Sequence, residues 1–458
     1  MVFCGKTVKI SSQALFLVFC LSFLNATESH GWMSRYNGPA DSWDRAYALT
    51  LDAAGNVYVT GASESVETFV DYATIKYGSF GRRLWVARYN GSADYADKAY
   101  SIAVDGYGNA YITGESWGSE TDQDYATVKY DENGEEVWVA RYNGPGNGRD
   151  VANALVVDEL GNVYVTGFSY GTGTLGDYTT IKYDTDGNEL WVSRYDGPSS
   201  GLDVPKAIAI DGVGNVYVTG ESVDYNDSYT TIKYDSEGNE LWVARYSATT
   251  YFNDVARAIT VDGEGNAYVT GFSYDTGTEH DYATIKYDGD GNELWVERYN
   301  GTGNSWDSAH SIAVDGAGNV YVTGQSSGID TGYDYATVKY DADGNELWTA
   351  RYDGPAGDDD MAKSITLDGE GNVYVTGKSH GIGTDWDFAT IKYDSDGNEE
   401  WIWRFNYLGD SDDRAKAIAI DHDGNICVTG RSRESGESFD YTTLKYFLYT
   451  PYNAAVSE

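Results

Sequence analysis

The segment Asp158–Tyr195 reads DELGNVYVTGFSYGTGTLGDYTTIKYDTDGNELWVSRY, and it is one copy of a unit that fills most of the 458-residue chain. Its Gly-Asn-x-Tyr-Val-Thr-Gly string recurs with a spacing of 53 residues six times and 51 residues once. The copies begin at Gly55, Gly108, Gly161, Gly214, Gly265, Gly318, Gly371 and, as a variant, Gly424. A period of this length indicates a repeat architecture, which outweighs the length-based expectation of about three domains.

Each unit divides into four strand-sized runs. In the quoted copy these are the apolar run before Asp158, the Tyr-Val-Thr run, the Tyr-Thr-Thr-Ile-Lys-Tyr run, and a run that begins at Trp191. Gly-Asn turns join the first run to the second and the third to the fourth, and Gly supplies the positive φ that a tight hairpin needs. Four-stranded antiparallel units in series predict an all-β fold, the β-propeller.

The order of the runs also predicts how the ring closes. The chain opens on a Trp strand at Trp32–Tyr36, whereas the eighth unit ends at Tyr446 without one. We therefore expect the N-terminal strand to complete the last of eight blades. The predicted organisation is a single propeller domain over residues 32–446, followed by a C-terminal tail, 447–458.

Residues 1–26 have the pattern of a secretory signal peptide: Lys6 and Lys9 precede an apolar run, Ala14–Leu24, and small and polar residues follow. That run is too short to span a bilayer, and no later run is long and apolar enough. We expect a secreted, periplasmic or cell-surface protein without a membrane span. Cys427 is the one cysteine of the mature chain, and we expect it to be buried as a small hydrophobic residue.

Charge narrows the range of partners. The chain has 72 Asp and Glu against 31 Lys and Arg, a formal net charge of −41. Phosphate-rich partners need a basic surface, so nucleic acid is excluded as a partner. The protein is expected to be a monomer.

The strings Asp-x-x-Gly-Asn-x-Tyr-Val-Thr-Gly and Asp-Tyr-Ala-Thr-Ile-Lys-Tyr-Asp-x-Asp-Gly-Asn-Glu-Leu-Trp resemble the seven-bladed β-propeller (SBBP) repeats of bacteria and archaea. The resemblance covers residues 32–446 and implies exported or cell-surface proteins without a shared chemistry. The chain departs from the family name in having eight copies. A weaker resemblance is to quinoprotein propellers, because Gly187 and Trp191 match the spacing of their docking motif, although the adjacent Cys pair of those enzymes is absent.

The Gly-Asn hairpins should lie together on one face, which is uniform and acidic. Asp-x-Asp-Gly is how a calcium-binding loop begins, so the paired carboxylates are candidate ligands: Asp184, Asp186, Asp288, Asp290, Asp341 and Asp343. The later ligands of such a loop are missing, and a turn uses Asp and Asn for its own hydrogen bonds. We therefore expect a structural role and no cofactor, with calcium as the alternative.

Two further sets recur in every copy. One is an Asp eight residues before the Asp that ends the first run, from Asp44 to Asp413, and the other is an Arg three residues after each repeated Trp, from Arg35 to Arg404. Partly buried charges need partners. We expect the two sets to pair with each other and to serve the fold.

The opposite face should differ from copy to copy. Its loops carry aromatic residues outside the repeated Trp set: Trp43, Trp117, Tyr251, Phe252, Trp306, Tyr333 and Trp386. The third residue after each recurring Asp also varies, and includes Arg257 and His310. Because variable loops on a rigid scaffold commonly carry binding residues, we predict a ligand site here. The alternative is that each ring packs over its own blade.

No sequence pattern for catalysis is present: there is no Gly-x-Ser-x-Gly elbow, no phosphate-binding loop and no metal-ligand spacing among the five His. The sequence therefore favours a binding scaffold that recognises a polysaccharide or a protein through its variable face. The alternatives are an extracellular structural protein without a specific ligand, and a quinoprotein-like or lyase-like propeller enzyme.

Overall fold

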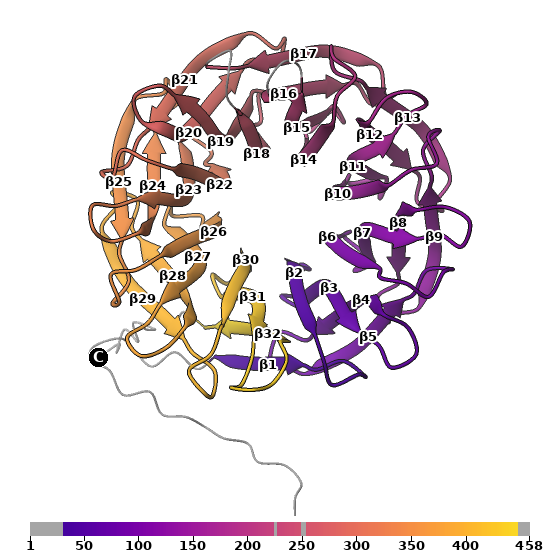
Figure 1. Ribbon diagram of the computed structural model, residues 1–458, viewed down its shortest axis with the longest axis horizontal. Helices are drawn as coiled ribbons and strands as arrows, with labels where there is room; N and C mark the ends of the chain where they lie inside the picture. Colours follow the sequence, from indigo (N-terminus) through magenta and orange to yellow (C-terminus); the bar gives the residue numbers. More distant parts are fainter. Residues whose placement is uncertain (1–30, 224–226, 249–252, 448–458) are drawn as a thin grey trace, which may run out of the picture.

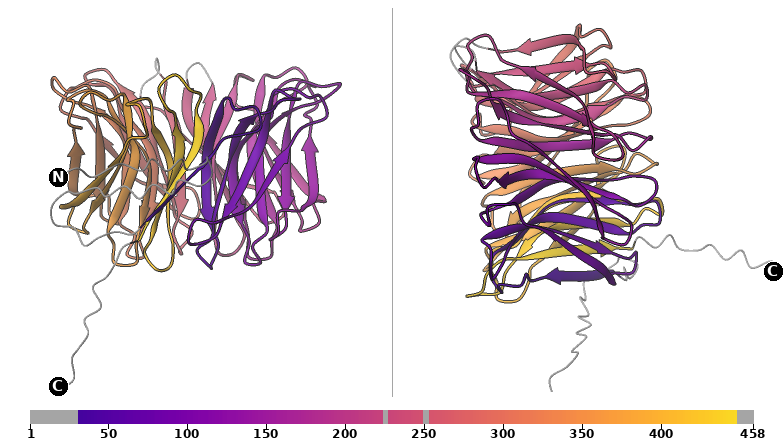
Figure 2. Two further views of the ribbon diagram at one scale, coloured as in Figure 1. Left: turned by 90° about the horizontal axis from the view of Figure 1, so that it is seen from below. Right: turned by 90° about the vertical axis from the view of Figure 1, so that its right-hand side faces the viewer.

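The computed structural model describes residues 31–223, 227–248 and 253–447. These residues form eight four-stranded antiparallel sheets arranged as the blades of a ring (Figure 1). Side views show all blades at one level, with loops at both ends of the strands (Figure 2). The all-β propeller with eight blades is confirmed. The predicted signal peptide, residues 1–26, lies outside the described residues, as does the C-terminal tail except for Phe447.

The first and second strands of each blade lie toward the ring axis, with the first innermost (Figure 1). The innermost strands are β2 (Asp44–Leu51), β6 (Lys98–Val104), β10 (Asp150–Val157), β14 (Asp203–Ile210), β18 (Val255–Val261), β22 (Asp307–Val314), β26 (Asp360–Leu367) and β30 (Arg414–Ile420). The second strands are β3 (Val57–Glu64), β7 (Ala110–Trp117), β11 (Val163–Tyr170), β15 (Val216–Val223), β19 (Ala267–Asp275), β23 (Val320–Ser327), β27 (Val373–His380) and β31 (Ile426–Ser432).

The third and fourth strands complete each blade toward the outside. The third strands are β4 (Val70–Tyr77), β8 (Gln123–Tyr130), β12 (Gly176–Tyr183), β16 (Asp227–Tyr234), β20 (Glu279–Tyr287), β24 (Tyr333–Tyr340), β28 (Trp386–Tyr393) and β32 (Asp440–Tyr446). The outermost strands are β5 (Arg83–Tyr89), β9 (Glu136–Tyr142), β13 (Glu189–Tyr195), β17 (Glu240–Tyr246), β21 (Glu293–Tyr299), β25 (Glu346–Tyr352), β29 (Glu399–Phe405) and β1 (Trp32–Tyr36). Blades are numbered 1 to 8, starting with β2–β5 and ending with β30–β32 plus β1.

The ring closes as predicted. Strand β1 pairs antiparallel with β32, from Trp32 opposite Lys445 to Tyr36 opposite Tyr441. The indole Nε1 of Trp32 also donates to the Ser79 carbonyl of blade 1, at 3.0 Å. Blade 8 is therefore built from both ends of the chain, and the same N-terminal strand joins it to blade 1.

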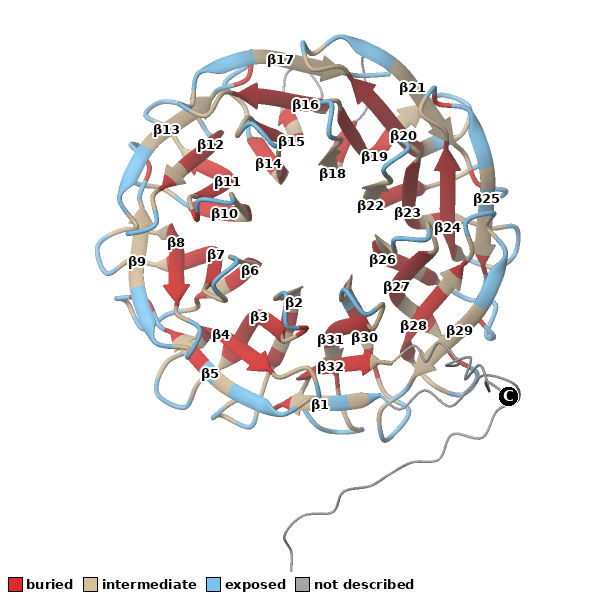
Figure 3. Cartoon of the chain, turned by 180° about the vertical axis from the view of Figure 1, so that it is seen from behind, coloured by how far each residue is buried: buried red, intermediate tan, exposed pale blue. Residues whose placement is uncertain are grey.

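The second and third strands form the buried layer of each blade, while the outermost strands are exposed (Figure 3). In blade 1, Tyr58, Val59 and Ile75 are fully buried, and the Oγ1 atoms of Thr60 and Thr74 lie 2.9 Å apart across the two strands. The cores lie between neighbouring blades and repeat around the ring, so burial of aliphatic and Tyr side chains supplies most of the stabilisation. Cys427 belongs to one of these cores, as expected, and burial raises the pKa of its thiol to about 12.

Polar contacts tie each blade to the next. The Tyr72 hydroxyl donates to the Ala126 carbonyl of blade 2 at 3.1 Å, and the Trp85 indole donates to the Glu132 carbonyl at 3.1 Å. The Trp85 ring packs so closely on Gly134 that a Cβ there would lie 2.7 Å from it. The repeated Gly and Trp are therefore a docking pair between blades.

The recurring arginines also join blades. Arg141 donates to the Asp124 carboxylate at 2.9 Å, to the Ser116 hydroxyl at 2.6 Å, and to the Tyr89 hydroxyl of the preceding blade at 3.0 Å. The corresponding ion pairs in the described residues are Arg35–Asp440, Arg88–Asp71, Arg194–Asp177, Arg298–Asp281, Arg351–Asp334 and Arg404–Asp387. In seven blades the arginine thus pairs with an Asp near the start of the third strand, whereas in blade 4 Arg245 donates to the Ser228 hydroxyl at 2.9 Å.

The predicted pairing of Arg with the Asp44-to-Asp413 set is wrong. Asp97, a member of that set, is fully buried and accepts backbone N–H groups from Gly91 at 2.6 Å and Trp117 at 3.0 Å. The Ser116 hydroxyl stands between Asp97 and Arg141. Burial raises the pKa of Asp97 to about 6. These carboxylates therefore fasten loops to the blade, because backbone donors satisfy them without a cation.

No helix in the described part of the chain is long and apolar enough to cross a membrane.

Candidate functional site

The varying residue of each innermost strand occupies a β-bulge. In every blade the strand pairing skips one residue at this point, which leaves that residue out of the ladder. The eight residues, which we call the bulge ring, are Tyr47, Tyr100, Asn153, Lys206, Arg257, His310, Lys363 and Lys416. Five consecutive blades, 4 to 8, carry Lys, Arg or His at this position, whereas blades 1 to 3 carry Tyr47, Tyr100 and Asn153.

Neighbouring members of the bulge ring contact each other. The rings of Tyr47 and Tyr100 lie 5.8 Å apart. Arg257 donates from Nη1 to Nδ1 of His310 at 2.7 Å, and Nζ of Lys363 lies 3.0 Å from Nε2 of the same imidazole. Burial, followed by the charges of Lys363 and Arg257, lowers the pKa of His310 well below its usual value. The structure thus places the two predicted residues, Arg257 and His310, side by side at the inner edge of the ring.

The predicted aromatic residues are mostly packed against their own or neighbouring blades. Trp386 is only 9% exposed, with the His380 ring 3.9 Å away, and the Trp306 ring lies 4.1 Å from His280. Trp43 is covered by the Arg45 guanidinium at 4.2 Å. The backbone N–H of Tyr333 donates to Asp359, across the boundary between blades 6 and 7. Tyr251 and Phe252 lie outside the described residues.

Exposed aromatic rings do occur on the variable face, at positions that the sequence analysis did not single out. Phe69, from the loop between β3 and β4, and Tyr95, from the connection before β6, are 62% and 54% exposed. Their rings stack, with centroids 5.7 Å apart and an angle of 16° between planes. The Trp117 ring supports Tyr95 from the blade side at 5.6 Å. We call Phe69, Tyr95 and Trp117 the aromatic platform. Both missed residues are aromatic residues outside the repeat pattern in variable loops, so the same criterion could have found them.

A second feature of the variable face is a group of cations on blades 7, 8 and 1, which we call the basic cluster. Its members are Arg45, Lys378, Arg414, Arg431 and Arg433. Arg414 and Arg431 are opposite one another on β30 and β31. The guanidinium carbons of Arg45, Arg431 and Arg433 lie 5.4, 4.4 and 4.9 Å from the centre of the Phe439 ring. The cluster stands out because the rest of the chain is so acidic.

Burial, followed by the charges of neighbouring cations, lowers the pKa values of two members of the basic cluster. Burial, followed by the nearby charges of Arg45 and Arg414, lowers the pKa of Arg431 to about 10. Burial and the Arg414 charge lower the pKa of Lys378 to about 8, with its Nζ 3.5 Å from the Trp386 ring centre. Asp412 forms a two-bond ion pair with Arg414. For the other four cations, the described residues provide no carboxylate within salt-bridge distance.

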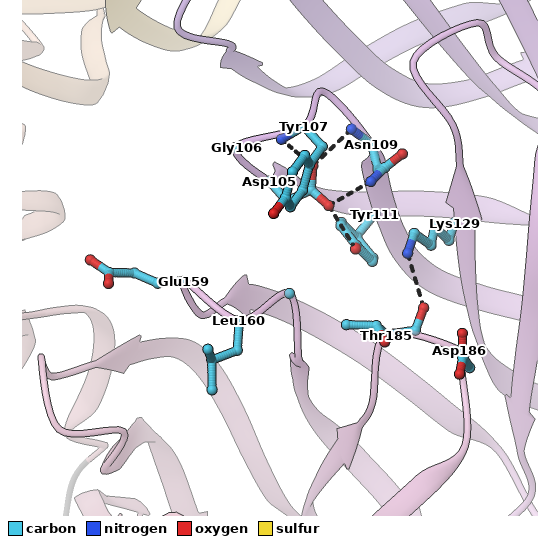
Figure 4. Close-up of a pocket in the computed structure, with 11 residues that line it drawn as sticks. Asp105, Gly106, Tyr107, Asn109, Tyr111, Lys129, Glu159, Leu160, Thr185 and Asp186 are labelled. Atoms are coloured by element: carbon cyan, nitrogen blue, oxygen red, sulfur yellow. Dashed lines mark hydrogen bonds between the residues drawn. The ribbon is translucent and has the colours of Figure 1, made fainter.

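The opposite, hairpin face holds shallow pockets whose polar groups serve the turns. In the pocket between blades 2 and 3, Asp105 accepts hydrogen bonds from the backbone of Tyr107 and Asn109 and from the Tyr111 hydroxyl (Figure 4). Lys129 donates to the Thr185 carbonyl at 2.9 Å. A similar pocket lies between blades 6 and 7. Because the repeat itself builds these pockets, they are poor candidates for a specific site.

The calcium candidates lie in the same kind of turn. Asp184 accepts N–H groups from the backbone of Asp186 and Asn188 and from the Asn188 side chain. Asp288 and Asp341 make equivalent bonds, and their second carboxylates, Asp290 and Asp343, follow two residues later. These hydrogen bonds lower the pKa of Asp184. The first carboxylate of each turn is thus already used by its own backbone, and calcium binding stays a prediction.

Comparison with known proteins supports the repeat assignment. The model of the SBBP β-propeller repeat matches the chain at residues 85–120, 193–226, 295–330 and 348–383. The resemblance read from the repeat strings is confirmed, and the ring has eight blades. The chain is a β-propeller repeat protein.

Individual relatives are distant. An uncharacterized WD repeat-containing protein, L264, of Acanthamoeba polyphaga mimivirus is 22% identical over 433 residues, covering 66% of this chain and 31% of that protein. Regulatory protein FlaEY of Caulobacter vibrioides is 29% identical over 196 residues, covering 38% of this chain and 20% of that protein. The chain therefore spans less than a third of the length of either relative.

Solved structures are similar at a low level. The periplasmic gluconolactonase PpgL of Pseudomonas aeruginosa has 12% sequence identity and a TM-score of 0.44, with 78% of this chain and 98% of that chain covered. A eukaryotic initiation factor has 9% identity and a TM-score of 0.42, with 79% and 88% covered.

Proposed function

We propose that this β-propeller repeat protein is an exported scaffold that binds a polysaccharide through its variable face. Export is proposed from the signal-peptide pattern of residues 1–26. The secreted, periplasmic or cell-surface space is where such a scaffold would meet polysaccharides. The proposed role is binding, without a reaction.

The aromatic platform is the observation that carries the proposal. Phe69 and Tyr95 come from neighbouring blades, and their stacked rings are more than half exposed. Exposing an apolar ring to water is unfavourable, so covering it with a ligand is favourable. Stacked rings also offer a flat apolar surface with little side-chain freedom left to lose. The C–H faces of a sugar ring fit such a surface.

The repeat architecture explains why a specific site belongs here. The ties between blades use residues that recur in every copy, such as Trp85 and Arg141. Phe69 and Tyr95 take no part in these ties, so the fold does not require them. What sets Phe69 and Tyr95 apart from singly exposed rings such as Phe80 and Tyr107 is that they stack on each other, with Trp117 behind Tyr95, and so form a surface for a ligand.

A binding screen with matched variants tests the proposal. The mature protein would be incubated with an immobilised panel of neutral and acidic polysaccharides, and any affinity measured by titration calorimetry with oligosaccharides. We expect Phe69→Ala and Tyr95→Ala to lower the affinity about tenfold each, since each removes an aromatic contact of about 1–2 kcal/mol. Thermal stability should change little, because both side chains are largely exposed.

The hairpin face offers controls of the same chemistry. Phe80 and Tyr107 are 83% and 85% exposed on that face, so Phe80→Ala and Tyr107→Ala remove rings that are even more exposed than those of the platform. These variants should bind like the unmodified protein. Equal losses on both faces, or no polysaccharide bound at all, would show that the platform is not a glycan site.

A further inference from the structure

We infer that the basic cluster is an anion site, and that the polysaccharide bound by the variable face carries carboxylate or sulfate groups which this cluster receives. The inference rests on the proposed function and specifies its ligand class. Arg45, Lys378, Arg414, Arg431 and Arg433 form the site.

The cations come from three blades and converge on one place. Arg45 comes from blade 1, Lys378 from blade 7, and the other three from blade 8. Three guanidinium groups lie around the Phe439 ring, which contacts them but carries no negative charge. A ring stabilises a nearby cation less than a carboxylate partner in a low-dielectric site would.

Donors in the cluster are left without acceptors. The Nε atoms of Arg45, Arg431 and Arg433 are buried and have no hydrogen-bond partner within the part of the chain that the structure describes. Burying an unpaired polar group is unfavourable, and more so when the group is charged. Planar guanidinium groups match carboxylate and sulfate oxygens in geometry, so an oxyanion would satisfy these donors.

The scaffold does not require this concentration of charge. The residues equivalent to Arg431 in blades 1, 3 and 6 are Ala62, Phe168 and Gln325. In blade 2 the equivalent position is Glu115, which forms ion pairs with Lys98 and Arg149. In blade 2 the repeat therefore places a carboxylate beside its cations. In blades 7, 8 and 1, Asp412 is the one described carboxylate that forms an ion pair with the cluster.

The location links the cluster to the aromatic platform. Trp43, which lies under Arg45, is fastened to the end of β3 because Glu64 donates its backbone N–H to the Trp43 carbonyl at 3.0 Å. Phe69 lies in the loop that follows β3. Both features therefore belong to the variable face of blade 1 and its neighbours, so one extended chain could meet both. The acidic remainder of the protein would repel a polyanion elsewhere, which confines such a ligand to this sector.

Calorimetry with defined oligosaccharides tests the inference. The probes are a galacturonate oligomer, a sulfated heparin-derived oligomer and a neutral galactose oligomer of similar length. We expect an acidic oligomer to bind at least about tenfold more tightly than the neutral one, and its affinity to fall as salt is raised. Arg45→Gln and Arg431→Gln should each remove most of that preference while leaving binding of the neutral oligomer unchanged.

Arg149→Gln is the matched control. It makes the same change in net charge on the same face, but Arg149 is paired with Glu115 and lies outside the cluster. It should change the affinity for the acidic oligomer less than about twofold. Thermal unfolding checks that the variants fold, and Arg433→Gln provides a third cluster variant.

The outcomes separate this inference from the proposed function. Equal affinity for acidic and neutral oligomers, or an acidic preference that survives both Arg45→Gln and Arg431→Gln, would overturn the anion site and leave the glycan-binding proposal standing. Absence of binding to every oligomer would overturn both. A preference for the carboxylated oligomer over the sulfated one, or the reverse, identifies which oxyanion the site receives.

Discussion

The eight residues of the bulge ring occupy one structural position, yet they range from Tyr47 to Lys416. Their neighbours in the strand are nearly constant because those side chains pack in the core, whereas a bulged residue leaves the ladder and is free to vary. Lys363 shows the consequence. Burial, followed by the charges around it, lowers its pKa to about 7. The charged groups that lower it are Lys416, Lys378, Arg257 and Arg414.

This pKa predicts how stability depends on pH. In the unfolded chain the Lys363 amine keeps its ordinary pKa of 10.5, so folding disfavours the protonated form. The resulting destabilisation is complete below the folded pKa of about 7 and disappears as the pH rises toward 10.5. Lys363→Met should therefore stabilise the protein at pH values near 6, by roughly 1–3 kcal/mol, and much less near pH 9.

Thermal unfolding at the two pH values measures the effect. Lys206→Met is the control, because Lys206 occupies the same bulge position but pairs with Glu221 at 2.9 Å. That variant should give no stabilisation at low pH. Equal effects of Lys363→Met at both pH values would contradict the lowered pKa.

Single residues also show what the sequence could and could not predict. The repeat strings identified the recurring Arg and two recurring Asp sets, but period alone cannot tell which Asp lies near the Arg. The answer depends on strand pairing, which places Asp124 and Arg141 on the adjacent strands β8 and β9. The exposed Phe69 and Tyr95 stack across a blade boundary, and only the assembled ring shows that neither ring is covered.

At the level of elements, the hairpin between the third and fourth strands docks one blade onto the next. Gly187, in the turn between β12 and β13, has φ +84°, and a Cβ there would lie 2.7 Å from the Trp138 ring of the preceding blade. Gly187→Ala should therefore destabilise the protein twice over, through backbone strain of about 1 kcal/mol and through a clash that adds roughly 1–3 kcal/mol.

A second glycine isolates the docking contribution. Gly424 has φ +82°, but no described atom lies within 4 Å of a Cβ built there. Gly424→Ala should cost only the backbone strain. The difference between the thermal midpoints of the two variants measures the Gly–Trp contact, and equal midpoints would show that the indole moves aside without cost.

The strands and turns themselves could be predicted almost completely. Alternation, Gly-Asn turns and a fixed period specify four strands per unit, and the leading Trp strand specifies the closure. The basic cluster could not be found in this way, because its members come from blades 7, 8 and 1, whose residues are far apart in sequence. Its one visible sign is Arg where other copies differ: Arg45 and Arg414 replace Val, Ser, Met or Lys, and Arg431 replaces Ala, Phe, Gln, Glu or Lys.

For the whole molecule, the place where the ring closes differs from the other blade boundaries. Blade 8 ends in β32, so it has no outer hairpin to supply a docking Gly. At the boundary with blade 7, Trp401 of β29 therefore has no docking Gly. It stacks instead on Trp403 of the same strand, with ring centroids 3.7 Å apart. At the boundary with blade 1, Trp32 of β1 packs against Gly81 of that blade. Within blade 8, Arg35 of β1 pairs with Asp440 at 2.8 Å. Strand β1 thus completes one blade and docks it onto the next.

Removing β1 should therefore weaken the entire ring. In a chain that begins at Asn37, β32 becomes an unpaired edge, Trp32 and Tyr36 no longer join blade 8 to blade 1, and Asp440 loses its partner Arg35. We expect the thermal midpoint to fall by roughly 5–10 °C relative to a chain that begins at Gly31, because contacts at both boundaries of one blade are lost. The exposed edge should also promote self-association, visible by light scattering. A chain from Gly31 to Phe447, which keeps every described strand, should unfold like the chain that begins at Gly31 and runs to the end. If the chain beginning at Asn37 does so too, contacts among the inner strands of blades 8 and 1 are sufficient to close the ring, and β1 is not needed for closure.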